Sequence, residues 1–145
     1  LHLSLRRQRQ MCIRDSGITD TALEEFMRFD APLHLFERTA TADTELGGVA
    51  IKEGQKIAAL IGSANRDESV FSSPESMDLT RDPNPHIGFG AGIHFCLGAP
   101  LARLEMSVSL PALWEKYPNM QLAGEAIRRP TFVLRGYESV AIQAS

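Results

Sequence analysis

The sequence predicts an α+β fold in which helices flank small antiparallel sheets. Apolar residues recur at helical spacing in two separate stretches, near residues 19–32 and 97–117. Between these stretches, residues 35–62 contain short β-prone runs that glycines and a turn divide, as in small antiparallel strands. The residues from 131 to 142 alternate again. Helices and paired short strands therefore occupy separate parts of the chain, which is typical of the α+β class.

Composition limits what kind of protein this is. The 145 residues are 43% apolar and 23% charged, as in a soluble globular domain. The apolar run at residues 57–61 is far shorter than the roughly 20 residues of a membrane-spanning helix, so we expect no membrane segment in this chain. Net charge is −3, and residues 1–16 alone carry +3, which leaves −6 for the remainder. An acidic remainder argues against a nucleic-acid partner.

The two cysteines give no sign of a disulfide framework or of a zinc site. Cys12 and Cys96 are widely separated and belong to no zinc-type Cys/His spacing, so we expect no disulfide framework and a cytoplasmic location.

Residues 1–16 differ sharply in composition from residues 17–145 and lack the apolar middle of a secretory signal. We expect them to be a tail, or sequence joined artificially to a truncated reading frame, and leave them out of the fold prediction.

The first helix is expected within ITDTALEEFMRFDAP, residues 18–32. Capping residues begin it, apolar residues follow at helical spacing, and Pro32 ends it. The capping residues are Thr19, Asp20 and Thr21, and the apolar residues are Leu23, Phe26 and Met27. Small antiparallel strands should then follow over residues 35–62, divided by the glycine pair at 47–48 and by the turn at 52–55.

A long irregular segment is expected from Ser63 to Pro85, because it is rich in Ser, Asp, Asn and Pro and shows little periodicity. Four apolar residues should hold it against the fold: Val70, Phe71, Met77 and Leu79. A long ordered loop of this kind usually serves a site.

The second helix should begin near Pro100, which suits a first turn. Its apolar residues at spacings of four, three and four predict one buried stripe: Leu97, Leu101, Leu104 and Val108. Pro111 should kink or divide this helix before it ends near Tyr117. The alternating tail TFVLRGYESVAI predicts two strands that turn at Gly136.

The stretch FGAGIHFCLG surrounds one cysteine with three glycines. Cys96 lies just before a predicted helix, where free backbone N–H groups and the helix dipole favour a thiolate. The glycines would let the backbone approach a planar ligand and direct N–H groups at the sulfur: Gly90, Gly92 and Gly98. Phe89 would cover the sulfur. The alternative is a buried structural cysteine in a glycine-rich turn.

FGAGIHFCLGAPLARLE resembles the cytochrome P450 family of haem-thiolate monooxygenases, whose cysteine-ligand signature runs FxxGxxxCxG, and most of all the soluble bacterial branch. The resemblance implies that residues 17–145 are the C-terminal, proximal haem-binding part of the mainly helical P450 fold. It implies haem b (iron protoporphyrin IX) as cofactor, Cys96 as ligand of its iron, and five further haem contacts within the motif: Phe89, Gly90, Gly92, His94 and Gly98.

The resemblance also assigns a Glu-x-x-Arg pair, which EFMR supplies as Glu25 and Arg28. At i and i+3 they share one helix face and form a structural ion pair; the alternative is an exposed pair worth little. Family members complete this pair with an arginine, but Ser76 occupies the matching position here. Arg81 and His86 are the candidates to replace the missing arginine, because both lie near position 76 in the sequence.

Other positions follow from the same resemblance. Arg38 and His94 fall where haem propionates are bound; the alternatives are a solvated strand residue and an ordinary loop histidine. Residues 33–36 fall where family members line the distal pocket, although core packing explains the apolar ones equally well and His34 is more simply a partly exposed polar residue. Arg103 would face an acidic electron donor, or is ordinary surface charge.

The implied function is that of a monooxygenase that inserts one oxygen atom from dioxygen into a small apolar substrate, with a ferredoxin or flavoprotein as electron donor. The central helix that delivers protons on the distal side of the haem is absent from these residues, so we assign no catalytic residue and expect the isolated chain to be inactive. Two alternatives stay open: a non-catalytic haem-binding module, and a truncated product without a stable cofactor site.

Overall fold

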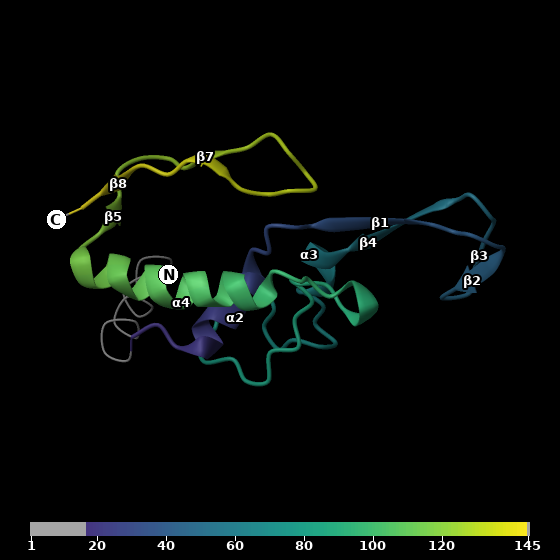
Figure 1. The fold of residues 1–145 in the computed structure, drawn as a ribbon, viewed down its shortest axis with the longest axis horizontal. Helices are drawn as coiled ribbons and strands as arrows, with labels where there is room; N and C mark the ends of the chain where they lie inside the picture. Colours follow the sequence, from purple (N-terminus) through teal and green to yellow (C-terminus); the bar gives the residue numbers. More distant parts are fainter. Residues whose placement is uncertain (1–16, 145) are drawn as a thin grey trace.

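The computed structural model describes residues 17–144, and the prediction for residues 1–16 lies outside this part. In chain order the elements are α2 (Asp20–Phe29), β1 (Leu35–Thr39), β2 (Thr44–Leu46), β3 (Val49–Ile51), β4 (Lys56–Leu60), α3 (Ile61–Ala64), the 3₁₀ turn η1 (Gly92–His94), α4 (Ala99–Lys116), β5 (Gln121–Leu122), β6 (Ile127–Arg128), β7 (Tyr137–Ser139) and β8 (Ile142–Gln143). Helices α2 and α4 pack together near the C-terminal strands, and β1–β4 extend away from them toward the other end of the molecule (Figure 1). Helices flanking small antiparallel sheets were predicted, and the α+β class is confirmed.

Helix α2 begins and ends where its capping residues predict. The hydroxyl of Thr19 accepts a hydrogen bond from the Ala22 N–H (3.3 Å), and Asp20 places a negative charge in the first turn. At the other end, the N–H of Asp30 bonds back to the carbonyl of Phe26. One face of α2 is buried, and it carries both apolar and charged side chains. The helix therefore contributes to the core and also places the charged side chains of Glu25 and Arg28 inside the protein.

The strands of residues 35–60 pair as predicted. β1 and β4 are antiparallel, with Leu35 opposite Leu60 and Arg38 opposite Ile57. β2 and β3 form a hairpin across Gly47 and Gly48, whose φ angles of 58° and 79° are positive and therefore suit glycine. Arg38 thus lies on a paired strand, where the backbone holds it in place.

The C-terminal strands differ from the prediction. β7 pairs with β6, and β5 pairs with β8, so residues 131–135 are not a strand and Gly136 is not a hairpin turn. Residues 131–136 instead form a loop docked on residues 32–34 by backbone hydrogen bonds. The Arg135 N–H donates to the Pro32 carbonyl (2.7 Å), and the His34 N–H donates to the Val133 carbonyl (2.9 Å). Alternation was present in the sequence, but it did not determine the pairing partner.

Helix α4 lies where it was predicted, but the face that it buries is opposite to the predicted one. Pro100 lies in its first turn and it ends before Tyr117, but Pro111 lies inside the helix without dividing it. The predicted buried stripe is exposed: Leu97 98%, Leu101 58%, Leu104 59% and Val108 63%. The face that packs on α2 instead carries Ala99, Ala102 and Met106, against Met27 and Phe89. Small alanines allow close contact between the helices, whereas periodicity alone does not say which stripe has a partner.

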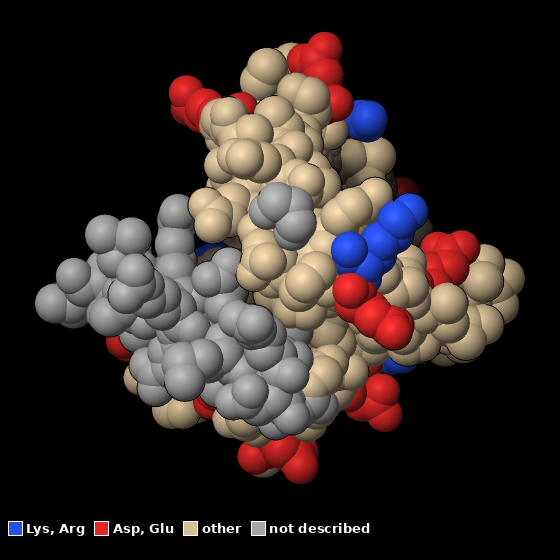
Figure 2. Space-filling view, turned by 90° about the vertical axis from the view of Figure 1, so that its left-hand side faces the viewer, with Lys and Arg blue, Asp and Glu red and all other residues tan. Residues whose placement is uncertain are grey.

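An irregular segment was predicted at residues 63–85, and the structure has it at residues 65–91, because α3 extends to Ala64 and no further element begins before η1. Phe71 holds it to the fold at 3% exposure, but Val70 is 56% exposed, so its predicted role in anchoring the segment is wrong. Viewed from the end that carries β5 and β8, the part of the surface formed by the described residues is mostly uncharged, with scattered acidic and basic groups (Figure 2). Among the helices of residues 17–144, none has the length and apolar character that a membrane crossing would require.

Candidate functional site

The cysteine loop is a closed turn held by backbone hydrogen bonds. The Cys96 N–H donates to the carbonyl of Phe89 (2.9 Å), and the Phe95 N–H donates to Gly92 across η1 (3.1 Å). Gly90 and Gly92 have φ angles of 76° and 65°, so both positions favour glycine for backbone reasons. Gly98 has a φ of −83° and is not required by the backbone.

Cys96 is exposed, so the alternative of a buried structural cysteine is wrong. The thiol precedes α4 by three residues, and the Ala99 N–H bonds to the Cys96 carbonyl (3.2 Å). A methyl group added at Gly98 would come within 3.8 Å of the sulfur. This distance is an ordinary van der Waals contact, so a methyl group at position 98 would touch the sulfur without a clash and cover part of its surface.

Two apolar side chains on either side of the cysteine point into solvent. Ile93 is 97% exposed and Leu97 is 98% exposed, which is unusual for branched apolar residues. Phe89, in contrast, is buried in the core cluster with Met27 and Ala99. The cysteine loop thus presents a sulfur between exposed apolar groups, on a base that is anchored to the core.

Arg38 and His94 line one pocket of about 150 Å³, although they come from β1 and η1. Phe36 and Gly90 also line it, and the Arg38 guanidinium lies 5.7 Å from the centre of the Phe36 ring. Arg38 donates one hydrogen bond, to the Glu37 carbonyl, among the described residues. The pocket therefore offers a cation with free donors beside a histidine, next to the cysteine loop.

Glu25 and Arg28 form a fully buried ion pair, with both side chains at 0% exposure, so the alternative of an exposed pair is wrong. Two hydrogen bonds join them: the Nε of Arg28 donates to Oε2 of Glu25 (2.8 Å), and the Nη2 of Arg28 donates to Oε1 (2.7 Å). The remaining Arg28 donors reach three backbone carbonyls: those of Asn65, Pro74 and Ser76. All five guanidinium N–H groups are satisfied, which is what a buried arginine requires.

Arg81 supplies the third member of this network. Its Nε donates to Glu25 (3.1 Å), and its side chain is 8% exposed. Position 76 takes part through its backbone carbonyl, so a serine there still serves Arg28. Burial would raise the pKa of Glu25, but the hydrogen bonds from Arg28 and from the Asp78 N–H, with the charges of Arg28 and Arg81, outweigh it and hold that pKa below its ordinary value of 4.5.

His86 does not contact Glu25; it bonds to the neighbouring Glu24 (2.8 Å). Glu24 also accepts two hydrogen bonds from Arg103 of α4, at 2.5 and 2.8 Å. The Arg103 guanidinium lies 4.6 Å from the centre of the Phe89 ring. Arg103 therefore connects α2 and α4 beside the cysteine loop and is more than an ordinary surface charge, while its side chain stays 38% exposed.

Sequence reasoning missed two asparagines in this network. Asn65 is fully buried, and its Oδ1 accepts the Ile87 N–H (2.8 Å) just before the cysteine loop. Asn84 donates to Glu25 (3.1 Å). Neither lies in a recognisable motif; both were predicted to lie in an irregular segment, and a long ordered loop that serves a site was the available signal.

The positions implied for a distal pocket have different surroundings. Leu33 forms a bridge to Leu134. His34 is partly exposed, as predicted, and it also bonds to Arg135. Phe36 lines the pocket of Arg38.

The family model described as Cytochrome P450 matches residues 5–125. Among curated relatives, the putative cytochrome P450 YjiB of Bacillus subtilis is 54% identical over 100 residues, which are 69% of this chain and 25% of that protein. Cytochrome p450 CYP199A2 of Rhodopseudomonas palustris is 44% identical over 129 residues, which are 89% of this chain and 31% of that protein. The chain thus spans about a third or less of these two relatives.

Solved structures give the same result. P450BioI, crystallised in complex with an acyl carrier protein ligated to hexadec-9Z-enoic acid, matches with a TM-score of 0.92 and 37% identity over 96% of this chain and 37% of that one. The bacillaene polyketide synthase cytochrome P450 PksS of Bacillus subtilis matches with a TM-score of 0.89 and 40% identity over 99% of this chain and 39% of that one.

Proposed function

The chain belongs to the cytochrome P450 family, and from this premise we propose that residues 17–144 form the proximal haem-binding part of a haem-thiolate monooxygenase. The observation that carries the proposal is the exposed sulfur of Cys96 in a closed glycine turn, between two apolar side chains and beside a cationic pocket. These features suit a flat, apolar cofactor that bears carboxylates.

The residues fit such a cofactor in three ways. Cys96 would be the thiolate ligand of the iron, and the lack of side chains at Gly90 and Gly92 would let the ring approach the backbone. Ile93 and Leu97, otherwise exposed, would contact its apolar surface. Arg38 and His94 would bind its propionates, since a guanidinium matches carboxylate geometry. We infer haem b, iron protoporphyrin IX, as the cofactor.

Haem supplies the binding and activation of dioxygen, and a thiolate ligand favours cleavage of the O–O bond by donating electron density to the iron. The chain's own contribution is to hold the sulfur. The Cys96 to Phe89 hydrogen bond fixes the turn, and Phe89 itself is anchored in the core by Met27 and Ala99. A ligand held on a rigid base keeps its direction and its electron donation.

The proposed reaction inserts one oxygen atom into a small apolar substrate, with electrons from a ferredoxin or flavoprotein in the cytoplasm. Support comes from relatives named as monooxygenases, among them the steroid C26-monooxygenase of Rhodococcus jostii, which is 45% identical over 123 residues. We expect the chain by itself to be inactive as an oxygenase, because no residue proposed to hold the cofactor here is assigned to the activation of dioxygen.

The test is an absorption spectrum of the purified chain mixed with haem and reduced under carbon monoxide. A strongly red-shifted Soret band that is present in the native chain and absent in Cys96→Ser supports thiolate ligation. Cys12→Ser is the matched control, and it should keep the band.

Turnover and haem retention separate the two alternatives. A thiolate spectrum without turnover in a longer protein that carries this chain would favour a non-catalytic haem-binding module. Failure of the folded native chain to retain haem would favour a product without a stable cofactor site.

A further inference from the structure

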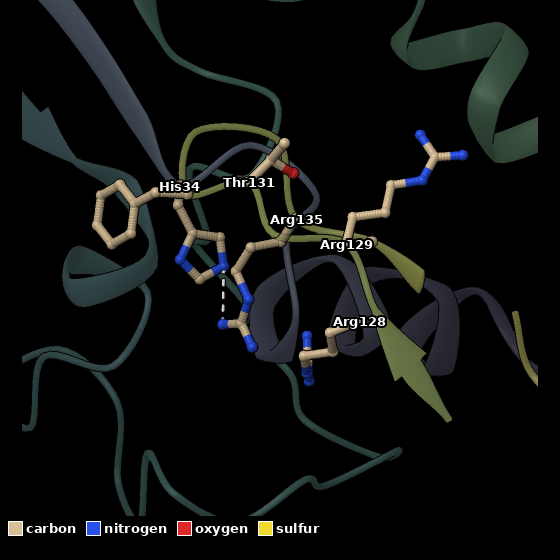
Figure 3. A pocket seen from close by; sticks show the side chains of 7 residues that line it. His34, Arg128, Arg129, Thr131 and Arg135 are labelled. Atoms are coloured by element: carbon tan, nitrogen blue, oxygen red, sulfur yellow. Dashed lines mark hydrogen bonds between the residues drawn. The ribbon is translucent and has the colours of Figure 1, made fainter. Parts of the chain in front are cut away.

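A second pocket, of about 240 Å³, lies away from the cysteine loop and shares no lining residue with the pocket of Arg38 and His94. Its polar lining residues are His34, Arg128, Arg129, Thr131 and Arg135. Figure 3 shows the guanidinium groups of Arg128 and Arg135 close together beside His34, whereas Arg129 extends away from them. Two cationic groups from different parts of the C-terminal segment therefore converge on one hollow.

Few acceptors are available for these cations. The nearest carboxylate is that of Asp30, which lies 3.6 Å from Arg128 and 3.5 Å from Arg135, longer than a good hydrogen bond. Among the described residues, neither Arg128 nor Arg129 donates a side-chain hydrogen bond, while Arg135 donates one, to Nε2 of His34 (3.1 Å). Two guanidinium groups lie near one carboxylate and Arg129 points away from it, so most of the donors of the three arginines are left for a ligand or for water.

His34 positions Arg135. Burial lowers the pKa of His34, and the charge of Arg135 lowers it further, with smaller effects of Arg128 and Arg66 and an opposing effect of Asp30. A neutral imidazole accepts through one nitrogen, which is the role His34 has toward Arg135. The other nitrogen lies against Gly62, where an added Cβ would come within 2.7 Å.

The backbone around the pocket is also fixed. The N–H groups of Arg135 and Arg129 donate to the carbonyls of Pro32 and Gly136, at 2.7 and 3.0 Å. The Arg128 guanidinium lies 4.6 Å from the centre of the Tyr137 ring. Donors that are held in place before a ligand arrives lose less conformational entropy on binding.

We propose that this pocket binds the phosphate group of a ligand, with Arg128 and Arg135 as the binding residues. Three arginines line the pocket and Asp30 offsets one of their charges, so a net charge of about +2 remains, which a dianion balances and a singly charged carboxylate does not. A phosphate dianion approaches guanidinium groups closely and in a bidentate manner, and it therefore competes better with Asp30. The proposal does not depend on haem or on Cys96.

Calorimetric titration of the protein with inorganic pyrophosphate tests this. We expect saturable binding that weakens at least tenfold in Arg128→Gln and in Arg135→Gln. Asp30→Asn should change affinity in the opposite direction, several-fold tighter, because it removes the competing carboxylate. Lys116→Ala, which removes a cation on α4, is the matched control and should bind as the native protein does.

Equal affinity in the native protein and in folded Arg128→Gln overturns the proposal, and so does weaker binding in Asp30→Asn. If Arg135→Gln fails to fold, these two variants still decide. A second arm identifies the source of the phosphate: vesicles containing phosphatidic acid are compared with vesicles of phosphatidylcholine alone. Sedimentation with the former that Arg128→Gln abolishes supports a lipid headgroup, and pyrophosphate binding without it supports a free phosphate compound.

Discussion

Glu24 of α2 accepts two hydrogen bonds from the Arg103 guanidinium of α4, at 2.5 and 2.8 Å. The same carboxylate bonds to His86, which precedes the cysteine loop by a few residues. Arg103 in turn lies over Phe89, whose carbonyl receives the Cys96 N–H. Glu24 thus connects both helices to the residues that hold the sulfur.

This relationship predicts a pH-dependent contribution to stability. The hydrogen bond from Arg103, the largest effect, lowers the pKa of Glu24 below 4.5 despite partial burial, and His86 lowers it further. A carboxylate with a lowered pKa in the folded state stabilises the fold above its unfolded pKa, and this stabilisation is lost as pH falls through the folded pKa. Glu24→Gln should therefore lower the free energy of unfolding by about 1 kcal/mol at pH 7.

The difference between Glu24→Gln and the native chain should shrink as pH falls below the ordinary glutamate pKa of 4.5, as measured by urea unfolding at pH 7 and at a series of lower pH values. Glu105→Gln removes a carboxylate from an exposed position of α4 and should show neither effect. A difference that grows on acidification would contradict the assigned role of Glu24.

The buried network predicts unequal costs for its two arginines. Arg28→Ala leaves Glu25 charged and buried, at a cost of about 3–5 kcal/mol, which is a large part of the stability of a small domain. Arg81→Ala leaves Glu25 bonded to Arg28, so we expect a loss of about 1.5–3 kcal/mol. Urea unfolding of both variants measures these losses.

A double-mutant cycle identifies the third partner of the Glu25–Arg28 pair. Coupling energy between Glu25→Gln and Arg81→Ala should be clearly above zero, while Glu25→Gln and His86→Ala should act additively. The reverse pattern would show that His86, and not Arg81, supports the buried carboxylate.

The pocket beside the cysteine loop predicts weaker haem retention without loss of the thiolate spectrum. Arg38→Ala and His94→Ala should each weaken haem binding about tenfold, because each removes a group proposed to bind a propionate. Transfer of haem to a scavenging protein measures the loss. Lys56→Ala removes a cation from the same sheet outside the pocket, and a transfer rate as fast as that of Arg38→Ala would argue against the propionate assignment.

Alanine substitutions at two glycines of the loop should distinguish the effect of backbone strain from the effect of space around the sulfur. At Gly92, with a φ of 65° and open space around it, alanine should cost about 1–2 kcal/mol of stability. At Gly98, alanine fits the backbone but places a methyl group 3.8 Å from the sulfur, so stability should persist while haem loading falls.

Stability of the haem-free chain and haem affinity are measured for both variants. Gly54→Ala, at another positive φ in a distant turn, is the control that should lose stability without a separate effect on the sulfur. Equal effects of Gly92→Ala and Gly98→Ala on both quantities would refute the distinction.

Local signals in the sequence predicted local structure well. Thr19 caps α2, Gly47 and Gly48 join β2 to β3, and the positive φ of Gly90 and Gly92 agrees with the reason for expecting glycine there. Each of these features depends on a few neighbouring residues, so the chain near the feature contains the information that determines it.

Features that depend on distant partners were predicted poorly. Leu101 and Leu104 form a good apolar stripe on α4, but α2 packs on the alanine face instead. Arg81 reaches Glu25 from 56 residues away, and sequence proximity could not separate it from His86. Strand β7 could pair with a strand on either of its edges, because the alternation of apolar and polar residues indicates which face of the strand is buried but not which strand is its partner.

The hydrogen bond from the Cys96 N–H to the Phe89 carbonyl has a consequence for how this loop can vary. Exchanging the side chains at Ala91, Ile93 or Phe95 leaves the number of residues between donor and acceptor unchanged. One inserted residue would move the sulfur by as much as about 3.5 Å, whereas the iron–sulfur bond proposed for Cys96 would tolerate an error of about 0.2 Å. We therefore expect this loop to accept some changes of side chain, whereas an insertion or deletion of a single residue would abolish the proposed ligation.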